Sequence, residues 1–333
     1  MVEKEVNVDA PTIKVSDTKA ALLMLGAYYR SKFEIPVVAL TGSVGKTTTK
    51  DFTHLVVSAK YKAIKTLGNL NNEIGLPQML LQIDNSVEAA VIEMGMNHFG
   101  EISKLVNATK PTVALITNIG VSHIENLGSR EGILKAKLEI LEGLRENAPL
   151  IINVDNDMLS TVKDVNHPLI TFGINSGNFK AENIKENKNS TSFDIKYYNE
   201  TQHIVIPTVG EHNVYNALAA FAVGYVLNVD KNDAATALSK YSPSGMRQKY
   251  VECNGVTVIE DCYNASPDSM KASLLTLGKV KGNKKIAVLA DMLELGDYSK
   301  DAHKSVGKMV ADNKIDYLLS FGNDAKYYVS EAK

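Results

Sequence analysis

The sequence predicts an α/β protein built on a parallel β-sheet, and three observations support this prediction. Short apolar runs without polar alternation recur after residue 36, beginning with Val37–Leu40. Amphipathic helical stretches separate these runs, beginning with Lys46–Ser58. The chain of 333 residues has 44% hydrophobic and 22% charged residues, which is typical of a globular protein large enough for two domains. Buried strands that alternate with helices indicate a parallel sheet covered on both faces.

The first half of the chain has a regular order of elements. Residues 2–15 are expected to be extended, and Ser16 or Asp17 is expected to cap the next helix through its side-chain oxygen. The predicted strands that follow are Val37–Leu40, Ala63–Thr66, Ala89–Met94, Thr112–Asn118 and Leu150–Val154. The predicted helical segments among them are Lys46–Ser58, Leu76–Leu81, Gly100–Asn107, Arg130–Leu144 and Met158–Val162.

The second half changes pattern twice. Residues 169–209 hold short alternating runs broken by Gly, Asn and Ser, which predicts a small antiparallel insert. After two helices, at Val214–Leu227 and Asp233–Tyr241, the turn-rich Tyr241–Gly245 predicts a domain boundary. The elements expected beyond it are strands Val256–Asp261, Lys285–Leu289 and Tyr317–Phe321, with helices Ser269–Leu277, Ala302–Asp312 and Ala325–Ala332. We therefore expect domains at 16–241 and 242–333, the second being an incomplete Rossmann-like α/β domain.

Charge and composition disfavour several classes of protein. A net charge of −2 gives no electrostatic reason to expect a nucleic-acid partner. No apolar run approaches the roughly 20 residues that span a bilayer, and the charged N-terminus (Glu3, Lys4, Glu5) is unlike a signal peptide. Two cysteines, Cys253 and Cys262, are too few for a disulfide framework or a zinc site. We expect a cytoplasmic protein without membrane insertion.

The turn between the first strand and its helix predicts a nucleoside triphosphate site. Backbone N–H groups in such a turn, together with a helix N-terminus, attract anions. Lys46 adds a full positive charge, and the Thr47 hydroxyl can bind a Mg²⁺ on the phosphates. Leu40 stands where the longer P-loop pattern has a glycine, so a chance Gly-Lys-Thr is the alternative, which the flanking strand and helix disfavour. The predicted site comprises Gly42, Ser43, Val44, Gly45, Lys46, Thr47 and Thr48.

Two further polar residues follow strands of the predicted sheet. Glu93 closes an apolar run, and a buried glutamate needs a cation partner. His123 follows the Thr112–Asn118 strand, where an ordinary surface histidine is the alternative. Ligands of an open parallel sheet bind beyond the carboxyl ends of its strands. Oxygen-rich sites suit Mg²⁺, which keeps waters and phosphates among its ligands.

A third group of polar residues lies near the predicted domain boundary. Asn213 and Asn216 are three residues apart on one helix face, where they could bind a base or a phosphate. Helix capping is the alternative for Asn213 but does not explain Asn216. Arg247 follows the boundary turn and could reach the phosphates as a bidentate clamp, although exposed arginines are also common.

Together these segments resemble the Mur ligase family, ATP-dependent amide-forming enzymes of peptidoglycan precursor synthesis. The shorter P-loop of that family, T-G-x-x-G-K-[ST], fits Thr41 to Thr47. Lys137 stands where some members carry a carbamylated lysine, whose added carboxylate turns a cation into a Mg²⁺-binding anion. Other family site positions have counterparts in this chain at Glu93, His123, Asn213, Asn216, Arg247 and Asp261.

Four stretches resemble the branch of the family that adds D-alanyl-D-alanine to a UDP-muramoyl-tripeptide. They are Gly68–Pro77, Glu93–Met96, Tyr263–Met270 and Asp291–Gly296. Cys262 replaces an acidic residue of the usual pattern, and Ser266 replaces an asparagine. The alternatives are a relative with another acceptor, such as a diamino acid or a folate glutamate chain, and a silent nucleotide-binding fragment. Family members carry a uridine-nucleotide domain first, so we expect residues 1–15 to be its remnant and the chain to be truncated at both ends.

The resemblance also implies a reaction with ATP and Mg²⁺ as cofactors. The γ-phosphate of ATP would pass to the tripeptide carboxylate, and the amine of D-alanyl-D-alanine would attack the acyl phosphate. Lys46 would hold phosphates, Thr47 and Glu93 one Mg²⁺, and His123 and carbamylated Lys137 a second. The expected nucleotide residues include Asn213, Asn216, Arg247 and Asp261, and the expected substrate residues are Asn69, Asn71, Asn72, Asn264 and Ser266. The partners would be these small molecules, bound by a monomer that closes across Ser242–Gly245.

Overall fold

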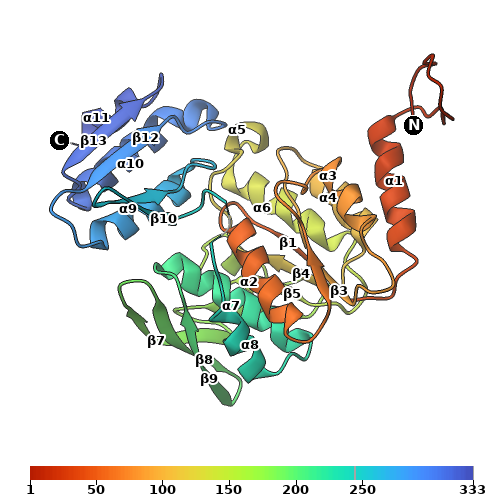
Figure 1. The fold of residues 1–333 in the computed structure, drawn as a ribbon, viewed down its shortest axis with the longest axis horizontal. Coiled ribbons are helices and arrows are strands. Elements are labelled where there is room, and N and C mark those ends of the chain that lie inside the picture. The colour runs from red at the N-terminus through yellow and green to blue at the C-terminus, as the bar shows by residue number, and fades with distance from the viewer. Residues whose placement is uncertain (244, 333) are drawn as a thin grey trace.

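A computed structural model of the chain describes residues 1–243 and 245–332 (Figure 1). It contains a nine-stranded sheet of order β2-β3-β1-β4-β5-β6-β7-β8-β9. These strands are β1 (Val37–Thr41), β2 (Ala63–Lys65), β3 (Ala89–Glu93), β4 (Val113–Ile116), β5 (Leu150–Asn153), β6 (Leu169–Gly173), β7 (Phe179–Glu186), β8 (Thr191–Tyr197) and β9 (Glu200–Ile206). Pairing is parallel from β1 to β6 and onto β7, and antiparallel between β7, β8 and β9. The predicted α/β class with a parallel sheet is confirmed.

Helices cover both faces of this sheet, as predicted. One face packs against α2 (Lys46–Ser58), α7 (Glu211–Val226) and α8 (Lys231–Leu238). The other packs against α1 (Thr18–Arg30), α3 (Gly75–Leu80), α4 (Glu101–Thr109) and α6 (Arg130–Leu138). Strand β1 shows why its sequence is apolar throughout: Val37 and Ala39 belong to one core cluster, and Val38 and Leu40 belong to the other. Fully burying a valine or leucine side chain stabilises the fold by about 1.5–3 kcal/mol.

The elements after residue 245 form a separate lobe, drawn in blue in Figure 1. Its two sheets have two strands each: an antiparallel pair of β10 (Lys249–Cys253) and β11 (Val256–Glu260), and a parallel pair of β12 (Ile286–Ala290) and β13 (Tyr317–Phe321). The helices are α9 (Pro267–Lys279), α10 (Ser299–Asp312) and α11 (Lys326–Glu331). The short helix α5 (Ile124–Leu127) of the first part faces this lobe, where it contacts the 3-10 turn Gly296–Tyr298.

Several sequence expectations need correction. Residues 169–209 are antiparallel only over β7 to β9, and they extend the main sheet instead of forming a separate insert, because β6 pairs in parallel with β5. The helix expected at Arg130–Leu144 ends at Leu138 and continues as the 3-10 turn Glu139–Leu141. The Met158–Val162 helix is a 3-10 turn at Leu159–Thr161.

The chain ends and the boundary also differ in detail from expectation. Residues 2–15 contain one isolated β-bridge, between Val2 and Lys14, and no strand. Asp17 caps α1 by accepting from two backbone N–H groups, as predicted. Strand β10 was not expected. The predicted boundary turn includes Ser244, which lies outside the described residues. In the described part of the chain, no helix is long and apolar enough to cross a membrane.

Candidate active site

The turn after β1 is held in place by the end of β4. Gly45 precedes α2 with φ 79°, a left-handed conformation that glycine adopts without strain. The Val44 N–H donates to Asn118 Oδ1 at 3.0 Å, and Asn118 Nδ2 and Thr117 Oγ1 each donate to the Val44 carbonyl at 3.0 Å. Two neighbouring strands therefore fix the loop that begins α2, before any ligand binds.

Lys46 lies in the cradle that this loop forms. Its Nζ donates to the carbonyls of Gly42 at 2.9 Å and Ser43 at 3.3 Å. Burial lowers the pKa of Lys46, and the nearby carboxylate of Glu93 partly opposes that shift. Thr47 lines the same cleft. Lys46 is half-buried, and in the described part of the chain its ammonium bonds only to carbonyls, so it is suited to receive an anion such as a phosphate.

Glu93 ends β3 and has the cation partner that the sequence predicted. The residue is 2% exposed, and its Oε2 lies 3.7 Å from Nζ of Lys50, which is also buried. Its Oε1 accepts from Asn71 Nδ2 at 2.8 Å. Among the described residues, Oε2 has no hydrogen-bond partner although it is buried. An anionic oxygen without a donor fits a hard cation such as Mg²⁺.

His123 begins α5, across the cleft from the P-loop. Its backbone is left-handed, with φ 64°, and its Nδ1 lies 2.5 Å from Oε2 of Glu294 in the lobe. Burial lowers the pKa of His123, the charges of Lys46 and Lys137 lower it further, and Glu294 opposes them. The neutral imidazole, the form that can bind a metal, is therefore favoured.

Lys137 is buried on α6, with 2% exposure. Burial, followed by the charge of Lys46, holds its pKa well below the usual range. No hydrogen bond or ion pair of its ammonium is found within 1–243 and 245–332. A neutral lysine amine is a nucleophile, so these surroundings suit carbamylation, and the resulting anion would offset the charge of Lys46. No three His, Cys, Asp or Glu side chains of the described residues form a ready-made metal cluster.

Asn213 and Asn216 line a smaller cavity of about 170 Å³ beside the P-loop. Asn216 Nδ2 donates to Asn213 Oδ1 at 3.3 Å, so the two side chains share one helix face as predicted. Asn216 Oδ1 accepts from Thr49 and lies 2.9 Å from the point where a Cβ on Gly45 would stand. Gly210 occupies the N-cap position of α7, so capping does not explain Asn213. The cavity carries amide groups that can hydrogen-bond to a nucleotide base.

Arg247 and Asp261 reach this region from the lobe. Arg247 lines both the smaller cavity and the main cleft, and its guanidinium lies 4.1 Å from the ring centre of Tyr263. Such stacking leaves the edge of the guanidinium available for an anion. Asp261 lines the smaller cavity and accepts from the Ser273 hydroxyl.

The main cleft has a volume of about 490 Å³ and brings together most of the predicted substrate residues. Asn71, Asn72, Asn264 and Ser266 line it, whereas Asn69 is exposed and does not. Ser266 also caps α9, since its Oγ accepts from the N–H of Ser269 at 3.3 Å. That capping bond gives Ser266 a structural role that its sequence position did not indicate. Substrate binding by these residues stays a prediction.

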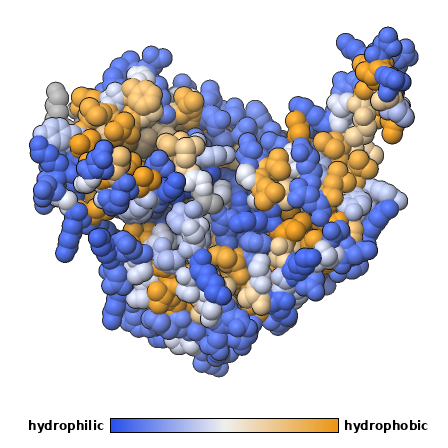
Figure 2. Space-filling model, viewed as in Figure 1, coloured by the Kyte–Doolittle hydropathy of each residue, from blue (hydrophilic) through white to orange (hydrophobic). Residues whose placement is uncertain are grey.

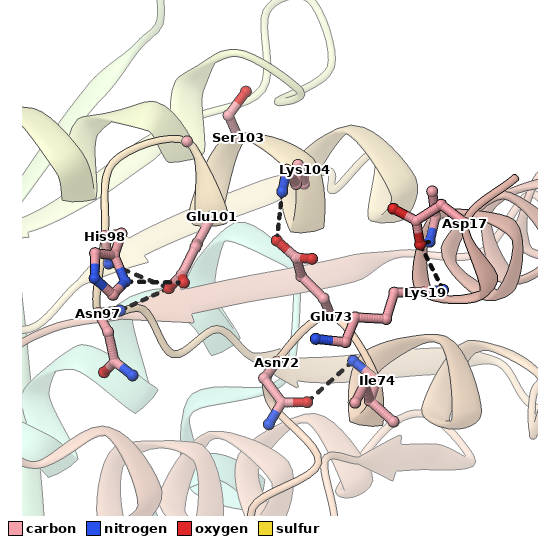
Figure 3. A network of polar contacts seen from close by, with 12 residues as sticks. Asp17, Lys19, Asn72, Glu73, Ile74, Asn97, His98, Glu101, Ser103 and Lys104 are labelled. Atoms are coloured by element: carbon pink, nitrogen blue, oxygen red, sulfur yellow. Dashed lines mark hydrogen bonds and ion pairs between the residues drawn. The ribbon is translucent and has the colours of Figure 1, made fainter.

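The wall of the cleft on the side of α1 and α4 carries a polar network (Figure 3). Lys104 Nζ lies 2.7 Å from Glu73 Oε1, and Glu101 Oε2 accepts from the N–H of Asn97 at 2.6 Å. Lys19 extends from the start of α1 toward the same space, and within the described residues its ammonium has no ion-pair partner. This wall therefore offers an uncommitted positive charge to an anionic substrate.

Several residues of the site were missed by sequence reasoning. Asn118 could have been found, because it follows an apolar run at the carboxyl end of a strand. Lys50 lies one helical turn after Lys46, a spacing that places it on the same face. Glu294 and Asp268 lie in stretches that the sequence singled out, yet only the fold places Asp268 at the smaller cavity and Glu294 against His123. Burial raises the pKa of Asp268, whose Oδ2 has no hydrogen-bond partner among the described residues.

Comparisons with known proteins agree with this geometry. The profile described as Mur ligase middle domain matches residues 40–224, and that described as Mur ligase, glutamate ligase domain matches 246–333. The UDP-N-acetylmuramoyl-tripeptide--D-alanyl-D-alanine ligase of Bacillus subtilis (strain 168) is 42% identical over 313 residues, which cover 93% of this chain and 68% of that protein.

Two solved structures extend the similarity to three dimensions. MurF from Acinetobacter baumannii matches with a TM-score of 0.94 at 33% identity, covering 99% of this chain and 73% of that one. MurF ligase from Thermotoga maritima in complex with ADP matches with a TM-score of 0.88 at 29% identity, covering 98% and 75%. The P-loop, the sheet and these relatives together show that the chain belongs to the Mur ligase family.

Proposed function

We propose that this chain is an ATP-dependent ligase that joins D-alanyl-D-alanine to UDP-N-acetylmuramoyl-tripeptide in peptidoglycan precursor synthesis. The observation that supports it most is the convergence of Lys46, His123 and the Glu93 oxygen that lacks a hydrogen-bond donor on one cleft of about 490 Å³. Relatives at up to 42% identity carry the name of this reaction. ATP and Mg²⁺ are the cofactors that fit this site.

The nucleotide is assigned to the P-loop and the adjoining cavity. The loop N–H groups and Lys46 hold the β- and γ-phosphates, and Arg247 reaches them from the lobe. Asn213, Asn216 and Asp261 face the nucleoside in the smaller cavity. The loop is already fixed by β4, so phosphate binding costs little reorganisation.

The chemistry assigned to the cleft is amide formation through an acyl phosphate. An oxygen of the tripeptide carboxylate bonds to the γ-phosphorus of ATP, and ADP leaves. The free amine of D-alanyl-D-alanine then attacks the acyl carbon, and phosphate leaves as the amide forms. Little covalent work falls to the protein, whose part is to position the groups and neutralise their charge. Bound Mg²⁺ would neutralise phosphate charge, with Thr47 and Glu93 at one site and His123 and carbamylated Lys137 at the second.

The organisation of the chain follows from the same proposal. We assign the central ATP-binding domain to residues 16–241 and the C-terminal ligase domain to 242–333, whose Arg247 and Asp261 reach the nucleotide. Asn71 and Asn72 of the first domain and Asn264 and Ser266 of the second face the substrates. The chain would act in the cytoplasm, since its substrates are small and polar, and we propose that it acts as a monomer. Size-exclusion chromatography with light scattering would test the monomer directly.

The proposal is tested by phosphate release from Mg·ATP in the presence of UDP-muramoyl-tripeptide. We expect release to require D-alanyl-D-alanine and not to be supported by L-lysine, diaminopimelate or glutamate. Release with one of these instead would assign the chain to another acceptor. ATP binding with no release under any condition would contradict the ligase and favour a silent nucleotide-binding protein. A Lys46→Met variant provides the background for the assay.

A further inference from the structure

Two residues with left-handed backbones meet at the edge of the cleft. His123 has φ 64° and Glu294 has φ 62°, a conformation that residues other than glycine seldom adopt. His123 begins α5 in the first part of the chain, and Glu294 lies in the loop between β12 and α10 of the lobe. Their side chains approach to 2.5 Å between Nδ1 and Oε2. Both unusual backbones therefore coincide with one contact between the two parts.

The surroundings of His123 leave this carboxylate as the partner of Nδ1. That nitrogen is buried, and Glu294 Oε2 lies within hydrogen-bond distance of it but outside good hydrogen-bond geometry; no other described residue bonds to it. The second nitrogen, Nε2, likewise has no partner among the described residues, and the ring lines the main cleft. A neutral imidazole carries its proton on one nitrogen and a lone pair on the other. A carboxylate beside Nδ1 favours the proton there, which leaves the lone pair on Nε2.

The contact depends on how the lobe sits. Backbone N–H of Glu125 donates to the Glu294 carbonyl at 3.4 Å, so the Glu294 loop rests on α5. Gly296 lies against Glu125 as well, where an added Cβ would come within 3.2 Å of its side chain. The carboxylate thus reaches His123 from a loop whose Glu294 and Gly296 rest on α5.

We propose that Glu294 is a positioning residue that selects the tautomer of His123 with an unprotonated Nε2, and does so only when its loop is docked. Histidines that bind metals commonly have their other nitrogen fixed by a carboxylate in this way. The use of Nε2 as a Mg²⁺ ligand rests on the proposed function, whereas the tautomer does not. The lobe would then complete the site in two ways. It would orient His123, which lies outside the lobe, and it would add its own Arg247 and Asp261.

The tautomer can be measured on the full chain without ATP, substrate or metal. Selective ¹⁵N labelling of histidine distinguishes the two tautomers by NMR, and a His123→Gln variant assigns the signal. We expect the Nδ1–H tautomer in the unmodified chain and a shift to Nε2–H in Glu294→Ala. Glu125→Ala is the matched control, since it removes a neighbouring carboxylate and leaves the Glu294 side chain in place, and it should match the unmodified chain. An Nε2–H signal in the unmodified chain, or an unchanged signal in Glu294→Ala, would overturn the inference.

A second readout separates positioning from simple docking. In Glu294→Ala the Mg²⁺ concentration for half-maximal phosphate release should rise about 10–100-fold, the usual effect of losing a partner of a metal ligand. The half-saturating D-alanyl-D-alanine concentration should stay unchanged, and Glu125→Ala should keep the original Mg²⁺ requirement. An unchanged Mg²⁺ requirement in Glu294→Ala would refute the positioning role. If the unmodified chain releases no phosphate, the proposed function fails, and the NMR result alone decides the tautomer.

Discussion

The strands around the P-loop and the strands of the lobe differ sharply in burial. All five residues of β1 are buried, whereas Val288 in β12 and Leu319 and Phe321 in β13 are 64%, 59% and 67% exposed. Figure 2 shows the corresponding hydrophobic surface gathered over the lobe. The residues of the phosphate site therefore rest on strands that are buried on both faces. The lobe contributes its groups from a less buried framework.

The contacts that join the two regions include several polar pairs of modest strength. Lys279 and Glu186 form an ion pair at 2.7 Å, and His212 and Gln248 approach to 3.0 Å. Ion pairs with this much exposure stabilise a structure by about 0–1 kcal/mol each. We therefore expect the lobe to move relative to the sheet more readily than the sheet itself deforms, which suits an enzyme that closes on its substrates.

The largest effect should come from the core of the main sheet. Ile92→Ala removes a fully buried side chain from β3 and should lower the free energy of unfolding by about 2–5 kcal/mol. Val288→Ala truncates an exposed side chain in β12 and should change it by less than about 0.5 kcal/mol. Urea denaturation of both variants tests this contrast. Equal losses of unfolding free energy would show that the main sheet and the β12–β13 sheet are equally important for stability.

Loss of the P-loop cation should abolish activity while sparing the fold. Lys46→Met removes a charge aimed at the phosphates, and phosphate release should fall by about 10²–10³-fold. Because burial disfavours the ammonium, the melting temperature should stay the same or rise. Lys62→Met, an exposed lysine of the same region, is the control and should keep full activity. Normal phosphate release by the Lys46→Met variant would show that the P-loop lysine does not bind the reacting phosphates.

The lobe should contribute to nucleotide affinity through one cation. Arg247→Ala removes the guanidinium that stacks on Tyr263, and ATP binding by calorimetry should weaken about 10- to 100-fold, the range for a charge-assisted hydrogen bond. Arg145→Ala, which removes a surface ion pair with Glu34, should bind ATP normally. Unchanged affinity in Arg247→Ala would mean that the lobe does not reach the nucleotide.

The smallest effect should be on the free energy of unfolding at acid pH, through a histidine of a helix that packs against the main sheet. Burial, and then the charge of Lys65, lowers the pKa of His54 on α2 to about 4, below its usual 6.5. The unfolded chain therefore takes up this proton first, and stability is lost as the pH falls from about 6.5 to 4. The loss should be about 1 kcal/mol after allowance for partial exposure.

His54→Gln should remove this contribution, so the variant should lose about 1 kcal/mol less than the unmodified chain between pH 7.5 and pH 4. Urea unfolding at the two pH values measures it. His98→Gln, a change at an exposed histidine that leaves His54 in place, should keep the full acid loss. Identical pH dependence in His54→Gln and the unmodified chain would rule out His54 as a source.

Sequence predicted the parts of the fold that local pattern determines. Helix α2 was predicted over Lys46–Ser58, the bounds that the structure has, because a glycine turn and an apolar strand precede it. Strand β10 was missed, since Lys249–Cys253 is short, does not alternate between polar and apolar residues, and is largely exposed. The parallel pairing of β6 with β7 could not be predicted, because only five residues connect them and parallel neighbours normally need a crossover of a dozen residues or more.

The candidate site also has parts that the sequence predicts and parts that only the fold creates. Lys46 and Glu93 were predictable because each follows a strand, and strand ends meet in a parallel sheet. The contact of His123 with Glu294 was not, since 171 residues separate them and only the docked lobe brings them together. Asn69 was predicted beside Asn71 and Asn72, yet the loop turns it away from the cleft.

We propose that this chain transfers a phosphoryl group to a carboxylate within the cleft. This proposal is tested most directly by labelling the terminal carboxylate of UDP-muramoyl-tripeptide with ¹⁸O and analysing the released phosphate by mass spectrometry. Because the acyl phosphate loses its bridging oxygen with the phosphate, the account predicts one ¹⁸O atom per phosphate formed from fully labelled substrate, in step with the dipeptide joined. Amide formation with unlabelled phosphate would contradict it.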